Sequence, residues 1–487
     1  MTFSSKHVYS AIRWALLARL SLQLVSWAST IIVMRLLSPG DYGTLAVAAI
    51  FTGLAALLSE AGLNEVILRH KAPDRAFQRA VLGAVLLLNS ALYLLLFASS
   101  GVIASSFDIP QLSTVLPLLA LQFMFNALAL LPVSLLERKL HYKAMAAVES
   151  VAVLSSIVCA LALAYLGYGV WALVWSAVLG SAMRYIAANL ISRSALLPSF
   201  RFSVLKAERS FASAVLLNKL CWYLSSVADD FIIGKLLGKE KLGYYAVSKD
   251  LALLFQQKTA AIIHQISFPL LSQSASNSQR NALVFKGAAL LSLLVLPLTL
   301  IMFSMAPLMV QVLLGERWQA VGPLLALMVL ALPVRVLNNV LGNAVAAAGY
   351  PQQRLLVQAC SLLLIIVLTA SGGLSFGLSG AVVGWLMANL LLLPLLLWRY
   401  LPCLHIALWP FISQLLANWQ ALLVLALLLL IQQLVPWHDT APLLILAINL
   451  LSAVLCYGLA SWRFNPDGCY SLRKLIQPSY AGAAKNS

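Results

Sequence analysis

Six basic side chains interrupt stretches of the sequence that are otherwise apolar, and they have the clearest capacity for chemistry. They are Arg19, Arg184, Lys219, Lys249, Lys258 and Arg335. A charge at the centre of a bilayer costs about 2.5–3.5 kcal/mol on insertion scales, so its presence in a membrane span indicates function. Arg184 is near the predicted end of its helix, where a long side chain can reach the interface, and we discount it.

Four of these residues are expected to form a cationic patch in the inner half of a central cavity. Arg19, Lys219, Lys258 and Arg335 occupy inner or middle positions of predicted spans. Arginine offers phosphate a forked pair of donors, and lysine offers a compact positive charge. The patch therefore suits an anionic cargo loaded from the cytoplasm, and we predict that the cargo headgroup carries phosphate.

A second group of charges occupies the outer third of two predicted spans and comprises Asp229, Asp230, Lys249 and Asp250. We predict that they either form ion pairs that close an outer mouth or bind a coupling cation or proton. An alternative stays open for all the intramembrane charges, namely that they are ion pairs that hold the helices together. Arg19 and Lys219 fit that alternative less well, because neither has a nearby acid on its own helix.

The elements that position these charges are apolar helices. Of the 487 residues, 62% are hydrophobic and 10% are charged, with a mean hydropathy of +0.93. Soluble domains carry about 25% charged residues, so a soluble multidomain enzyme is excluded. A span needs about 20 apolar residues, and we predict an all-α polytopic membrane protein with about 14 transmembrane helices. The predicted spans are 14–36, 41–62, 80–104, 112–134, 147–166, 168–191, 212–236, 243–269, 283–305, 320–346, 355–372, 376–398, 415–434 and 441–461.

The distribution of basic residues predicts the orientation of these helices. Lysine and arginine outnumber aspartate and glutamate by 32 to 15, which gives a net charge of +17. Most of the basic residues fall in segments on the same side as the N-terminus, so the positive-inside rule places both chain ends in the cytoplasm. The basic excess is mainly a topology signal, and nucleic acid is not an expected partner.

Two similar segments indicate an internal repeat. Residues 35–43 (RLLSPGDYG) and 235–243 (KLLGKEKLG) each join two predicted spans, at an offset of 200 positions. Chance similarity between apolar helices is the alternative. A true repeat predicts two pseudo-symmetric six-helix lobes that rock to alternate access to a cavity. The predicted lobes are 1–200 and 201–402, followed by two helices in 403–463 and a cytoplasmic tail from 464 to 487.

Sequence motifs for nucleotide, metal or cofactor binding are missing. The chain contains no phosphate-binding GxxxxGK[ST] motif, no CxxC and no cysteine–histidine spacing typical of zinc. The acids of the short outer loops, Asp41, Asp108, Glu316 and Asp439, fall on four separate loops. We therefore predict no catalytic residue, and a transporter in preference to a membrane-embedded glycosyltransferase or polymerase.

Several segments resemble Wzx-type polysaccharide flippases. They are residues 35–43, Ser59–Leu63 (SEAGL), Val66–Arg69 (VILR), Glu137–Tyr142 (ERKLHY) with Glu149, and Leu314–Trp318 (LGERW). These flippases form the polysaccharide transport branch of the multidrug/oligosaccharidyl-lipid/polysaccharide exporter superfamily, and the chain is most similar to the colanic-acid-exporter subgroup. The resemblance implies two lobes in a V, with two appended helices.

The resemblance also implies a cargo and a location. Such proteins carry undecaprenyl-pyrophosphate-linked oligosaccharide across the bacterial inner membrane for exopolysaccharide, capsule or lipopolysaccharide synthesis, and no cofactor is implied. Membrane lipids and the polysaccharide polymerase and export machinery are the expected partners. Glycan contacts are expected from Trp222, Tyr223, Tyr244 and Tyr245. The main alternative is a cation/drug antiporter of the same superfamily, which we disfavour because Glu60, Glu137 and Glu149 lie near the inner ends of predicted spans.

Overall fold

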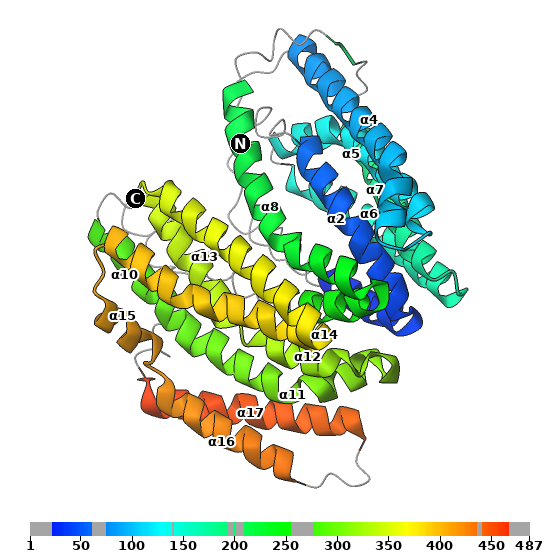
Figure 1. The fold of residues 1–487 in the computed structure, drawn as a ribbon. Coiled ribbons are helices and arrows are strands. Elements are labelled where there is room, and N and C mark those ends of the chain that lie inside the picture. Colours follow the sequence, from blue (N-terminus) through cyan, green and yellow to red (C-terminus); the bar gives the residue numbers. More distant parts are fainter. Residues whose placement is uncertain are drawn as a thin grey trace, which may run out of the picture. The chain divides into compact units, whose positions relative to one another are not determined.

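The computed structural model describes residues 22–60, 75–138, 141–192, 198–200, 209–254, 277–435 and 441–466. Within these ranges the regular elements are helices, and the chain divides into two compact units, Met1–Tyr244 and Tyr245–Ser487 (Figure 1). The first unit includes a helix that the predicted division places in the second lobe.

The first unit is a bundle of long apolar helices. Its elements are Leu22–Leu36, α2 (Pro39–Glu60), α4 (Arg75–Ser106), α5 (Leu112–Arg138), α6 (Tyr142–Tyr165), α7 (Val170–Ser192), α8 (Arg209–Leu237) and the start of a helix over 239–254. Helices α4, α5 and α7 pack side by side, with α6 against α7 and α2 against α5 and α8. One core cluster joins α2, α4 and α5 through Ala55, Leu92, Leu96, Ala120 and Phe123.

The second unit is also helical, and two of its predicted spans, 283–305 and 320–346, are assembled from shorter pieces. Its elements are α10 (Asn277–Leu290), a π-helical turn (Leu291–Val295), α11 (Leu296–Leu314), a 3-10 turn (Glu316–Trp318), α12 (Val321–Val329), α13 (Leu332–Ala347), α14 (Pro351–Cys403), α15 (Leu408–Leu415), α16 (Trp419–Leu434) and α17 (Pro442–Phe464). Helices α16 and α17 pack on α11 through Ile301, Met305, Leu425, Leu429 and Ala453.

The 53-residue element α14 is two spans joined at Gly377. This glycine has φ 63° and ψ −143°, a conformation that interrupts the helix and that side chains with a Cβ rarely adopt. The two halves then pack closely, because a Cβ on Gly384 would lie 2.0 Å from the oxygen of Leu368, and one on Gly372 would lie 2.1 Å from the oxygen of Gly380. The predicted break between spans 11 and 12 falls next to this turn.

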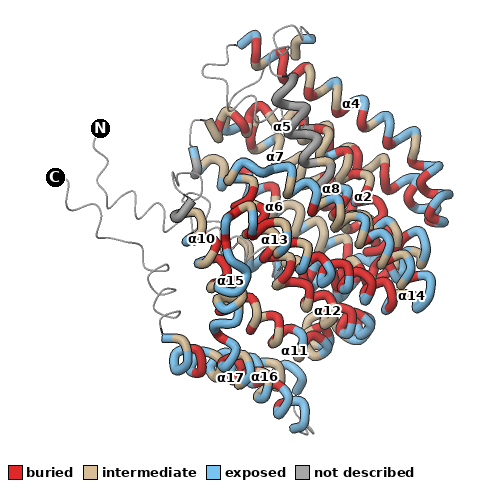
Figure 2. The backbone as a smooth tube through the Cα atoms, turned by 60° about the vertical axis from the view of Figure 1, so that its left-hand side comes forward, coloured by how far each residue is buried: buried red, intermediate tan, exposed pale blue. Residues whose placement is uncertain are grey.

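Ten helices in the described part of the chain are long and apolar enough to cross a membrane. Large apolar side chains are exposed along their outer faces, as on α16 and α17 (Figure 2), where Leu434 is 82% and Trp462 is 70% exposed. Apolar surface on this scale suits lipid as the surrounding medium. The predicted all-α polytopic class is therefore confirmed, whereas the count of fourteen spans and the position of both termini stay predictions.

Candidate functional site

Three of the four residues predicted to form the cationic patch have no described side chain. Arg19 and Lys258 lie outside the described residues, and Lys219 lies on α8 where only the backbone is described. The patch as a whole therefore stays a prediction. Arg335 is the member whose surroundings the structure gives.

Arg335 is held inside the second unit by two side chains of α14. Its guanidinium lies 5.4 Å from the ring centre of Trp385, and Nη1 donates to Oδ1 of Asn389 at 3.5 Å. Trp385 and Asn389 are themselves buried, and the Asn389 amide donates to the carbonyl of Trp385 at 2.8 Å. A planar cation supported on one face by an indole keeps a fixed direction, which is the property a phosphate-binding arginine needs.

We expect Arg335→Lys to lower the stability of the second unit, because lysine keeps the charge but loses the planar contact with Trp385 and the donor to Asn389. A desolvated cation–π contact contributes up to about 2 kcal/mol, so a fall in melting temperature of several degrees is expected in detergent. Arg399→Lys is the matched control, since Arg399 lies 4.5 Å from the ring centre of Trp398, which is 66% exposed. Equal effects of the two substitutions would contradict the anchoring of Arg335 by the buried side chains of Trp385 and Asn389.

The four residues of the predicted outer gate fall in both units. Asp229 is buried and Asp230 half-buried on α8 in the first unit. In the second unit, Lys249 is buried with its ammonium 5.8 Å from the ring centre of Tyr245, one turn earlier, while Asp250 is exposed. Neighbouring positions on a helix face different directions, so each acid is expected to serve a different contact. Ion pairing or ion coupling among the four stays a prediction.

The two repeated segments meet within the first unit. Each has a helix end, a break at Ser38 or Gly238, and a new helix from 39 or 239. A Cβ on Gly43 would lie 1.6 Å from the backbone oxygen of Lys239, and one on Gly243 would lie 1.8 Å from that of Pro39. The contact is reciprocal at the 200-residue offset, as expected for related segments that face each other across an approximate twofold axis. We call it the glycine junction.

Side chains of α8 reinforce this junction along α2 and α4. The Lys235 ammonium donates to the carbonyl of Ser106, and Phe107 makes edge-to-face contacts with Phe231 at 5.4 Å and Phe51 at 6.0 Å. Tyr223 donates from its hydroxyl to the carbonyl of Ile50 at 2.7 Å. Of the residues predicted to contact glycan, Tyr223 makes this packing contact and Tyr245 is buried, and their contact with glycan stays a prediction.

Side-chain hydrogen bonds of Ser38 and Asp41 fix the start of α2. Ser38 and Asp41 form reciprocal capping hydrogen bonds, from the Asp41 N–H to the serine Oγ at 3.2 Å and from the Ser38 N–H to Oδ2 at 3.0 Å. The second carboxylate oxygen of Asp41 accepts the Val170 N–H at 3.0 Å, at the first residue of α7. Asp41 is therefore a structural cap that ties α2 to α7.

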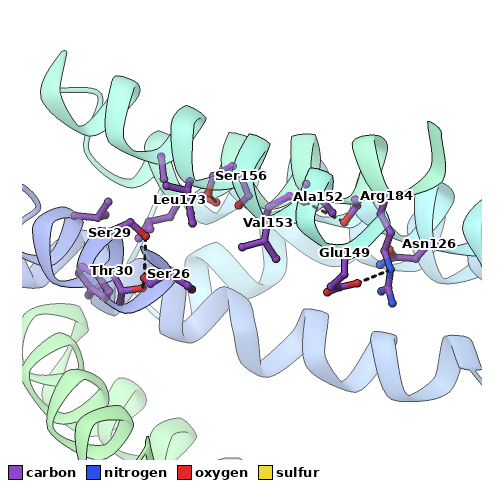
Figure 3. A pocket seen from close by; sticks show the side chains of 18 residues that line it. Ser26, Ser29, Thr30, Asn126, Glu149, Ala152, Val153, Ser156, Leu173 and Arg184 are labelled. Carbon is purple, nitrogen blue, oxygen red and sulfur yellow. Dashed lines mark hydrogen bonds and ion pairs between the residues drawn. The ribbon is translucent and has the colours of Figure 1, made fainter. Parts of the chain in front are cut away.

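A polar cavity lies between Leu22–Leu36, α2, α5, α6 and α7 within the first unit (Figure 3). It has a volume of about 450 Å³. Its polar lining is made of hydroxyls, one amide and one ion pair. These residues are Ser26, Ser29, Thr30, Tyr42, Asn126, Glu149, Ser156, Ser176, Ser181 and Arg184. A cavity of this composition inside an apolar bundle is a candidate binding site for a polar ligand.

The ion pair in this cavity joins α6 to α7. Nε of Arg184 lies 3.5 Å from a carboxylate oxygen of Glu149, and the side chains are 43% and 54% exposed. Arg184, near the predicted end of its helix, therefore has an acidic partner on α6, and its reach to the membrane interface stays a prediction. The sequence indicated this cavity through serines that recur on three apolar helices. They are Ser26, Ser29, Ser156, Ser176 and Ser181.

Residues 32–323 match the family described as "Polysaccharide biosynthesis protein". This match covers more than half of the chain. The chain belongs to the polysaccharide biosynthesis protein family. The predicted resemblance to polysaccharide flippases is confirmed by it, and this member of the family is a multi-pass membrane protein of the transporter type.

Two relatives and one solved structure are consistent with the assignment to this family. The lipopolysaccharide biosynthesis protein WzxC of Escherichia coli (strain K12) is 20% identical over 389 residues, which are 78% of this chain and 78% of WzxC. The succinoglycan biosynthesis transport protein ExoT of Rhizobium meliloti (strain 1021) is 22% identical over 333 residues, 68% of this chain and 67% of ExoT. A structure titled "Lipid II flippase MurJ, inward closed conformation" has a TM-score of 0.74 at 15% identity and covers 93% of this chain and 99% of its own. That likeness shows a shared fold.

Proposed function

We propose that this member of the polysaccharide biosynthesis protein family translocates undecaprenyl-pyrophosphate-linked oligosaccharide from the inner to the outer leaflet of a bacterial inner membrane. The family match over residues 32–323 carries the proposal. Two relatives are named for polysaccharide synthesis or its transport, and the fold is shared with a structure titled as a lipid II flippase. The polysaccharide polymerase and export machinery would receive the product.

The proposed mechanism is alternating access of two lobes, residues 1–200 and 201–402. The chain would cross the membrane fourteen times, and both of its ends would lie in the cytoplasm. Arg19, Lys219, Lys258 and Arg335 would bind the pyrophosphate in the inner part of the cavity, because two phosphate groups need several charge-assisted donors once water is removed. The lipid tail would remain in the bilayer, so only the polar headgroup would cross between the lobes.

A cation/drug antiporter is the weaker candidate. Such a protein needs an acid that a proton, a metal ion or a cationic drug can neutralise. Glu149, an acid lining the polar cavity of the first unit, already has Arg184 as its partner at 3.5 Å. A tethered guanidinium competes with any mobile cation, and this disfavours exchange at that carboxylate.

Deletion of the gene is expected to make a lipid-linked oligosaccharide accumulate with its glycan on the cytoplasmic side, because synthesis continues while export stops. Lipid extraction with mass spectrometry measures the intermediate, and a plasmid copy of the gene provides the control by restoring export. Failure of any such intermediate to accumulate would contradict the proposal. Extension of a lipid-linked acceptor by the purified protein would instead support a glycosyltransferase or polymerase.

A further inference from the structure

We propose that the polar cavity of the first unit is a glycan subsite, which binds the hydroxyl groups of a cargo sugar beyond the first. The inference rests on the proposed function and adds a second binding site to it, separate from the cationic patch predicted for the pyrophosphate. Three features of the cavity carry it: the orientation of its hydroxyl groups, the chemistry of its ion pair and its volume.

Four hydroxyl groups of the lining are arranged to accept hydrogen bonds. Those of Ser29 and Thr30 both donate to the carbonyl of Ser26, at 2.8 and 2.9 Å (Figure 3). The hydroxyls of Ser176 and Ser181 donate to carbonyls one turn earlier, at 2.9 and 3.0 Å. A hydroxyl whose proton is used in this way keeps its oxygen lone pairs for a ligand. The cavity thus presents acceptors, and a ligand rich in O–H donors is the complement.

The ion pair supplies both kinds of hydrogen-bonding group side by side. The Glu149 carboxylate accepts only, and the Arg184 guanidinium donates only, with the two groups 3.5 Å apart on neighbouring helices. Each sugar hydroxyl donates one hydrogen bond and accepts others, so two adjacent hydroxyls can use both partners. The half-exposed side chains leave the pair accessible to such a ligand. Asn126 adds an amide with both donor and acceptor atoms from α5.

A bound metal cation fits the same lining less well. Hydroxyl oxygens and a carboxylate are typical ligands of hard cations. Arg184 already supplies positive charge beside Glu149, however, and a metal ion there would meet a like charge. The volume of about 450 Å³ also exceeds the needs of one ion and falls within the range of about 300–1,000 Å³ for small-molecule sites.

The test compares two cargoes in proteoliposomes. One probe is undecaprenyl pyrophosphate carrying the complete oligosaccharide of the host strain, and the other carries the first sugar alone. The variant combines Glu149→Met with Arg184→Met, which removes both charges together while keeping side chains of similar length. We expect translocation of the complete oligosaccharide to fall at least about tenfold, since hydrogen bonds to charged groups are lost, while the single-sugar lipid moves at the wild-type rate.

The matched control is Glu316→Gln with Arg317→Gln, which neutralises one exposed acid and one exposed base that do not line the cavity. Asn126→Leu is a second cavity variant with a similarly branched side chain, and it is expected to reproduce the selective loss. Equal loss of both cargoes, or no loss of either, would overturn the subsite while leaving the flippase intact. If the wild-type protein moves neither cargo, the proposed function itself fails. Stabilisation of the wild type, but not of the Met variant, by sodium chloride over choline chloride would identify a cation site and overturn the proposal.

Discussion

Gly43→Ala and Gly243→Ala are expected to open the glycine junction and to reduce transport by at least about tenfold. The added Cβ atoms would lie 1.6 and 1.8 Å from the backbone oxygens of Lys239 and Pro39, so the helices must separate to admit either one. Overpacking of this kind costs about 1–3 kcal/mol. A cost of about 1.4 kcal/mol already shifts a two-state equilibrium tenfold, so the conformation in which these helix ends touch loses most of its population.

A reporter thiol measures the opening directly. Thr44 is fully buried next to the junction, and Thr44→Cys is a small change. In a background without the native cysteines, a membrane-impermeant maleimide is expected to label this introduced thiol faster once Gly43 or Gly243 is replaced. Gly40→Ala is the matched control in the same segment, because its nearest neighbours are side-chain atoms 3.8 Å away. If labelling and transport equal those of the Gly40 variant, the glycine junction does not stabilise the conformation in which the two helix ends touch.

The junction is also where sequence reasoning was most informative. The offset of 200 positions came from weak matches between apolar segments, and the structure places the two matched glycines against each other's helix starts. The break between spans 11 and 12 was readable at Gly377 for a different reason, because its φ of 63° would strain any residue with a Cβ. Glycines at close backbone contacts leave a local mark in the sequence, because no other residue has room there.

The sequence indicated the polar cavity much less clearly than the glycine junction. Glu149 and Arg184 are far apart in sequence, and their pairing depends on how α6 and α7 rotate about their axes. In a membrane bundle both the lipid-facing and the buried sides of a helix are apolar, so the sequence pattern does not fix that rotation. Only the recurring serines marked the inner face. The same difficulty applies to Asp229 and Asp230, whose burial differs although they are adjacent.

Alanine at both Arg19 and Lys219 is expected to abolish transport while leaving the protein folded in the membrane. The two positions match at the 200-residue offset, and each would contribute a charge-assisted hydrogen bond to the pyrophosphate of about 1.5–3 kcal/mol. Losing both would slow translocation by about two to four orders of magnitude. Removing a charge from a span makes insertion easier by about 2.5–3.5 kcal/mol, so a loss of transport would not come from failed insertion.

Measurements on purified protein distinguish a loss of cargo binding from a loss of folding or insertion. Expression level and melting temperature are expected to equal those of the wild type, while cargo translocation in proteoliposomes is lost. Lys241→Ala with Arg317→Ala removes the same amount of charge from exposed positions and is expected to keep full activity. Exchanging the residue types, with Arg19→Lys and Lys219→Arg, should restore part of the rate, because the charge remains but the forked geometry moves to the other span. Full transport by the double alanine variant would show that the cargo phosphate binds elsewhere, and Arg335 would then be the next position to neutralise.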